Sequence, residues 1–159
     1  MRRAVLWAGA GAVALAACGA RPESFNPDDP AVTAQIDSIM QGAIAGSRAA
    51  DADRVMAIAE GPSEFTFVTG DVLLSGVGPI TANFRKTYSL LTRQDQEVLD
   101  KRVRLVAPGV AVFTAVGEGT YTDKANWTSP PVGIGLTVVF AKQADGRWQA
   151  VHAHQSIAP

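Results

Sequence analysis

The chain has two histidines, His152 and His154, which lie two residues apart near its C-terminus. On a strand, side chains two apart project from the same face, so the imidazoles would lie about 6.6–6.8 Å apart along it. Imidazoles titrate near neutral pH, which suits a hydrogen-bond donor or a general base in a pocket. A structural role is the alternative, in which each ring bonds a neighbour and the pair sustains a sheet or a dimer.

The alternation of the same strand assigns Trp148 and Ser156 to the histidine face and Ala153 to the opposite face. We therefore predict that the histidine face lines a pocket. A metal site would need a third ligand and an open position. Glu118 could supply the ligand, but its spacing from the histidines does not require it. We predict no metal and no cofactor.

Five further residues could contact a ligand. Arg85 and Tyr88 fall on one face of an expected helix, and Glu118 lies in an expected strand. For Arg85, a solvated surface position is the common alternative. Tyr121 and Trp127 could form an aromatic rim beside a polar loop, although aromatic side chains there also suit packing within a hairpin.

The elements that must position these residues follow from periodicity. Asp29-Pro30 begins a helix whose apolar residues recur at helical spacing to Ile44, and a short helix follows from Asp51. A short hairpin is expected over 65–74 and a third helix over 80–91. Strands are expected over 97–106, 110–122, 132–142 and 147–157, with a tight turn at 144–146.

Helices first and long strands afterwards predict an α+β fold. Strands of this length twist and curl, so we expect a cone-shaped, curved antiparallel sheet wrapped around the N-terminal helices, with a pocket at its wide end. The 159 residues fit a single folded domain after a targeting segment. The net charge of −1 offers no basic surface for nucleic acid.

The N-terminal residues are typical of a targeting signal. Arg2 and Arg3 precede an uncharged run over 4–17, which is shorter than the ~20 residues that span a bilayer. Leu15-Ala16-Ala17-Cys18 resembles the lipobox of bacterial lipoproteins, in which the cysteine is lipidated and the chain is cut before it. A buried core cysteine is the alternative. The resemblance implies a signal peptide over 1–17, a lipidated Cys18 with a tether over 18–30, and a domain over 31–159.

If the lipobox functions, the protein is anchored in the bacterial cell envelope and faces the periplasm. Gly19 after the cysteine points to the outer membrane in bacteria that have one. The partners expected are then a membrane, reached through the lipid on Cys18, and a small-molecule ligand.

The segment 146–156, Gly-Arg-Trp-Gln-Ala-Val-His-Ala-His-Gln-Ser, resembles the last strand of SnoaL-like domains in the nuclear-transport-factor-2-like superfamily. It is also similar to the end of the association domain of calcium/calmodulin-dependent kinase II. The resemblance implies a cystatin-like cone, a small-molecule pocket within it, and a homodimer formed through the outer sheet face. Fold alone does not assign a function here, because the superfamily includes enzymes and members without chemistry.

The ketosteroid isomerases of this superfamily need an aspartate base and a tyrosine donor. Thr66 and Thr69 stand near the expected base position, and residues 31–48 contain no tyrosine. We therefore predict a lipid-anchored protein that binds a small apolar or amphipathic ligand or acts as a dimeric assembly module. The alternative is a small cyclase, isomerase or hydrolase that uses His152 or His154 as its base.

Overall fold

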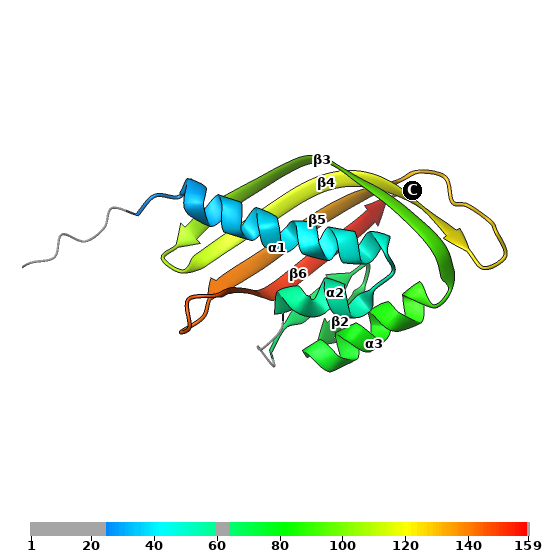
Figure 1. Cartoon of the computed structure of the whole chain (residues 1–159), viewed down its shortest axis with the longest axis horizontal. Coiled ribbons are helices and arrows are strands. Elements are labelled where there is room, and N and C mark those ends of the chain that lie inside the picture. The colour runs from blue at the N-terminus through cyan, green and yellow to red at the C-terminus, as the bar shows by residue number, and fades with distance from the viewer. Residues whose placement is uncertain (1–24, 60–63, 159) are drawn as a thin grey trace, which may run out of the picture.

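The computed structural model describes residues 25–59 and 64–158. Three helices precede most of the strands: α1 (Pro30–Arg48), α2 (Ala52–Met56), which continues as a 3₁₀ turn over Ala57–Ala59, and α3 (Val77–Tyr88). The strands are β1 (Thr66–Thr69), β2 (Val72–Ser75), β3 (Leu91–Ala107), β4 (Val110–Asp123), β5 (Val132–Lys142) and β6 (Trp148–Ala158). Figure 1 shows α1 lying across the long strands, with α2 and α3 beside its C-terminal half.

The six strands form one curved sheet in the order β2-β1-β6-β5-β4-β3. The α+β class and the curved sheet are as predicted, but the sheet is mixed, not wholly antiparallel. The exception is the short strand β1, which pairs in parallel with β6, while all the other pairings are antiparallel. This parallel pair joins the N-terminal hairpin to the C-terminal strand.

Local chemistry explains where α1 begins. The side chain of Asp29 accepts hydrogen bonds from Ala31 N (2.8 Å) and Val32 N (3.4 Å), and Pro30 occupies the first turn. Such a cap satisfies backbone N–H groups that have no partner within the helix. The preceding residues are held as well, because Leu105 N of β3 donates to Pro27 O at 2.8 Å.

The boundaries that differ most from the sequence prediction are those of the third helix and of the strand that follows it. The third helix ends at Tyr88, and β3 begins at Leu91 instead of residue 97. The first residues of β3 are mostly polar, so hydrophobic alternation did not mark them as a strand. They nevertheless pair with β4, from Leu91 opposite Asp123 to Gln96 opposite Gly119, with a register shift between Leu91 and Arg93.

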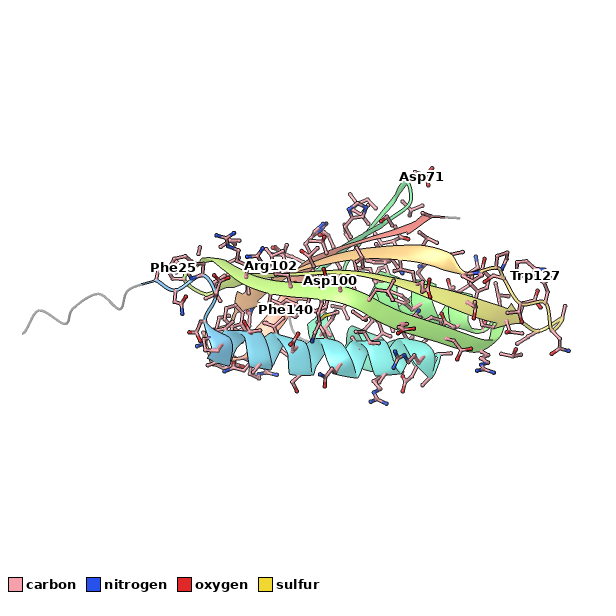
Figure 2. The ribbon with its side chains drawn as sticks, turned by 90° about the horizontal axis from the view of Figure 1, so that it is seen from above. Phe25, Asp71, Asp100, Arg102, Trp127 and Phe140 are labelled. Carbon is pink, nitrogen blue, oxygen red and sulfur yellow. The ribbon has the colours of Figure 1, made fainter. Side chains whose placement is uncertain are left out.

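The helices pack on one face of the sheet, called here the inner face; the opposite face is called the outer face. Phe113 and Phe140 on the inner face are fully buried, as are Ile36 of α1 and Ile80 of α3. Figure 2 shows Phe140 between α1 and the sheet. The core therefore lies within the hollow of the curved sheet.

A β-bulge in β6 reverses the expected alternation of that strand. His152 pairs with Val139, but Ala150 pairs with the next residue, Phe140, so that Val151 is an extra residue. An extra residue shifts the alternation by one position. Trp148 and the histidines therefore project from opposite faces, and the prediction that they share a face is wrong. The histidines are on the outer face.

Candidate functional site

The inner face encloses a cavity of about 300 Å³ at one end of the sheet. The C-terminal half of α1, α2 and α3 cover it, and β1 and the four long strands form its wall. Most of its described lining is apolar. Those apolar residues are Met40, Ala43, Ile44, Val55, Met56, Ile58, Phe65, Phe67, Phe84, Val98, Phe113, Ala115, Val116, Gly117, Gly119, Val132, Ile134, Leu136, Val138, Ala153 and Ile157.

Small residues of β4 leave this space open. Beyond the buried Phe113, the inward positions of the strand are Ala115, Gly117 and Gly119. A Cβ atom at Gly117 would lie 2.2 Å from the Glu97 carbonyl oxygen, and one at Gly119 would lie 2.7 Å from the Asp95 carbonyl oxygen. The glycines thus let β3 approach β4 closely where the sheet bends, and they add no side chain to the hollow.

A cluster of three polar side chains lies in the cavity wall where α1, α3 and β3 meet. The Tyr88 hydroxyl donates to Ser47 Oγ at 3.2 Å, and Gln94 Nε2 donates to the Ser47 carbonyl oxygen at 2.9 Å. Burial raises the pKa of Tyr88 above its ordinary value of 10.0, against the lowering effect of its side-chain hydrogen bonds with Ser47 and Gln94. The phenol therefore remains a neutral hydroxyl at physiological pH.

Aromatic rings connect this cluster with β1. The Phe84 ring centroid lies 5.6 Å from that of Tyr88 and 5.3 Å from that of Phe67. These distances are typical of favourable tilted ring contacts. The wall of rings ends beside the polar pair Thr69 and Gln155, which are register partners and both line the cavity.

The expected aromatic rim is present next to the cavity. Tyr121 lines the cavity, and its ring meets that of Trp127 edge-on at 6.1 Å. The loop carrying Trp127 is ordered by Asp123, whose Oδ1 accepts from Ala125 N (2.8 Å) and Trp127 N (3.0 Å). Trp127 is 54% exposed, and Figure 2 places it at the opposite end of the domain from Phe25.

The two histidines are not among the described lining residues. His152 Nδ1 shares a 2.7 Å hydrogen bond with Thr66 Oγ1 of the neighbouring strand, and His154 is exposed on the outer face. Their common face is as predicted, but the bulge at Val151 directs that face away from the cavity. The interpretation of the pair as pocket residues is therefore corrected, and the hydrogen bond of His152 matches its structural alternative.

The other sequence candidates divide between the cavity and the surface. Tyr88 and Tyr121 line the cavity. Arg85 forms an exposed ion pair with Asp53 at 2.5 Å and does not reach the lining. Glu118 lies outside the cavity, in a shallow polar groove beside it. Cys18 lies outside the described residues.

Neither a metal-binding cluster nor a membrane-spanning helix is present in residues 25–59 and 64–158. These residues contain no group of three or more metal-ligating His, Cys, Asp or Glu side chains. The same ranges include no helix whose length and hydropathy would let it span a bilayer.

Sequence reasoning missed Ser47, Gln94 and Gln155 as cavity residues. Ser47 follows Ile44, the last residue of the expected apolar stripe, and Gln94 precedes the expected start of the strand at residue 97. Gln155 shares its face with Ala153, which the predicted alternation had turned away from the pocket. The sequence did offer one signal. Gln155 is a polar residue between Ala153 and Ile157, the apolar residues two positions away on either side.

A curved mixed sheet enclosing an apolar cavity under three helices defines the cystatin-like cone class. The chain belongs to the SnoaL-like domain family, whose model matches residues 36–159. No curated protein matches the chain.

Solved structures share the fold at low sequence identity. A nuclear-transport-factor-2-like protein from Salmonella enterica has a TM-score of 0.73 and 18% identity, covering 82% of this chain and 92% of its own. Hexachlorocyclohexane dehydrochlorinase LinA-type3 from Novosphingobium barchaimii has a TM-score of 0.71 and 12% identity. The match covers 82% of this chain and 88% of the dehydrochlorinase chain. A Xanthomonas campestris protein like the calcium/calmodulin-dependent protein kinase II association domain has a TM-score of 0.62 and 21% identity, covering 81% and 86%.

Proposed function

We propose that this domain binds a small, mainly apolar molecule in the cavity beneath the curved sheet. The observation that carries the proposal is a partly open, mainly apolar cavity whose wall includes one organised polar cluster, Ser47, Tyr88 and Gln94. Ligand sites typically combine a concave apolar surface with a few placed polar groups that orient the ligand. The buried apolar area would supply affinity, and the cluster would supply orientation.

Binding is favoured over catalysis by His152 or His154. Among the described lining residues, the groups that titrate are Tyr88, Glu97 and Tyr121, and Glu97 is exposed. A general base must come within about 2.6–3.2 Å of the proton it removes. The imidazoles project from the opposite face of the sheet, so they do not meet this requirement for a molecule in the cavity. Related folds include enzymes, such as the dehydrochlorinase.

The proposal is tested with N-phenyl-1-naphthylamine, a neutral apolar dye that fluoresces when it leaves water. We expect saturable binding to the native protein. Ala115→Phe places a ring in the cavity and should weaken binding at least tenfold. Its matched control is Thr114→Phe, which adds a ring to the outer face of the same strand and should leave binding unchanged. Equal binding by both variants would show that the dye binds elsewhere.

We also propose that the protein is anchored by a lipid on Cys18, facing the periplasm. The described chain begins at Phe25, at the end of the domain away from Trp127 and the cavity. An anchor preceding Phe25 would leave the cavity end free. Metabolic labelling with an alkyne fatty acid should label the native chain and not Cys18→Ala, and labelling of both would contradict the lipobox interpretation.

A second candidate function is assembly as a homodimer through the outer face. Two exposed apolar side chains favour it: Leu73 of β2 is 64% exposed, and Val116 of β4, a residue that also borders the cavity, is 52% exposed. Pairing of two copies would cover both. Sedimentation velocity should show a dimer that Leu73→Arg weakens, because Leu73 does not line the cavity. A native protein that sediments as a monomer would contradict this proposal.

A further inference from the structure

The polar cluster in the cavity wall contains a hydroxyl whose proton has no recorded acceptor. Ser47 Oγ accepts from the Tyr88 hydroxyl at 3.2 Å, and a serine hydroxyl can donate one hydrogen bond while it accepts others. Within residues 25–59 and 64–158, no acceptor for the Ser47 proton is recorded. Thr81 on α3 differs, because its hydroxyl donates to Val77 O of its own helix at 2.7 Å.

The surroundings of Ser47 make this donor useful to a ligand. Ser47 is half-buried and lines the cavity together with Tyr88 and Gln94. Gln94 Nε2 binds the Ser47 carbonyl oxygen, so the end of α1 is fixed against β3 at this residue. A molecule that fills the cavity would exclude water from the Ser47 hydroxyl, and an oxygen on that molecule would give the hydroxyl proton an acceptor.

The charge of the lining restricts which molecule can supply that oxygen. The described lining contains no Lys, Arg or His side chain, and its one acidic residue, Glu97, is exposed. A carboxylate moved into this apolar space would lose its hydration without gaining a counter-charge. A carbonyl or ether oxygen loses much less hydration and can still accept a hydrogen bond.

We infer that the cavity selects neutral ligands that carry a hydrogen-bond-accepting oxygen, with the hydroxyl pair Ser47 and Tyr88 as the donor. This inference rests on the proposed function and specifies its ligand class. Gln94 acts as a positioning residue for Ser47. The raised pKa of Tyr88 agrees with this role, because the phenol keeps its proton over the physiological range.

Three naphthalenes of nearly equal shape test the inference by displacing N-phenyl-1-naphthylamine. They are 2-acetylnaphthalene, which has a neutral acceptor, 2-isopropylnaphthalene, which has none, and 2-naphthoate, which is charged. One net hydrogen bond should make the acetyl compound bind about fivefold more tightly than the isopropyl compound. The naphthoate should bind at least tenfold more weakly than the acetyl compound, because its charge is desolvated without a partner.

The double variant Ser47→Ala/Tyr88→Phe removes both donors, since the Tyr88 hydroxyl alone could replace that of Ser47. We expect the preference for the acetyl compound to fall to about onefold while binding of the isopropyl compound is retained. Thr81→Val is the control, because it removes a hydroxyl of α3 that does not line the cavity, and it should keep the fivefold preference. Circular dichroism of each variant verifies folding.

Two outcomes would overturn the inference while leaving the proposed function intact. In one, the three compounds bind the native protein equally. In the other, the acetyl preference persists in the double variant and is instead lost in Gln155→Leu, a variant of another polar residue of the lining. Failure of the dye and all three compounds to bind would refute the proposed function itself.

Discussion

The two ends of the hollow beneath the sheet differ in how they are filled. At the end near the start of α1, large side chains such as Phe140, Trp148 and Ile36 are buried and form a continuous core. At the other end, β4 presents Ala115, Gly117 and Gly119 to the same hollow, and a cavity remains. The same sheet thus provides stability at one end and space for a ligand at the other, through the size of its inward side chains.

The largest expected effect contrasts one residue from each end. Phe140→Ala should destabilise the fold by about 3–5 kcal/mol, because it removes a fully buried ring and leaves a void. Leu136→Ala should cost at most about 2 kcal/mol, because Leu136 is half-buried and already borders the cavity. Urea unfolding measures both. Equal losses would show that the two ends are packed alike.

A smaller effect is expected at the bend that shapes the cavity. Gly117→Ala should destabilise the protein by about 1–3 kcal/mol, because the new Cβ meets the Glu97 carbonyl oxygen and the backbone must move. Gly133→Ala is the control, since its Cβ has no neighbour closer than 3.9 Å. Thermal unfolding compares the two. If Gly117→Ala left the stability unchanged, β3 and β4 would not need to approach closely at this position.

The smallest effect concerns the pH dependence of the cavity end. The pKa of Tyr88 is raised on folding, so the folded chain keeps its phenol proton at a pH where the unfolded chain has lost it. The stabilisation from Tyr88 is therefore complete below pH 10.0 and is lost as the pH rises above that value. We expect the midpoint of thermal unfolding to fall more steeply between pH 9 and 11 in the native protein than in Tyr88→Phe. Parallel pH profiles would contradict this.

Sequence reasoning identified the architecture well and the cavity only in part. Asp29 and Pro30 predicted the start of α1, and the turn at Ala144-Asp145-Gly146 was found where expected, with Gly146 at φ +85°. Of the residues expected to contact a ligand, Tyr88 and Tyr121 line the cavity, and Trp127 packs against Tyr121 beside it. His152 and His154 were assigned to the inner face because a single strand shows its alternation but not its bulges.

Local rules determined what each segment became: caps, turn glycines and hydrophobic periods act within a few residues, and they are readable in the chain itself. Which way a strand faces depends on its partner across the sheet. The pairing of β6 with β5 inserts Val151 as an extra residue and turns Ala153 and Gln155 inward and the histidines outward. The cluster of Ser47, Tyr88 and Gln94 likewise exists only because α1, α3 and β3 meet, over separations of up to 47 residues.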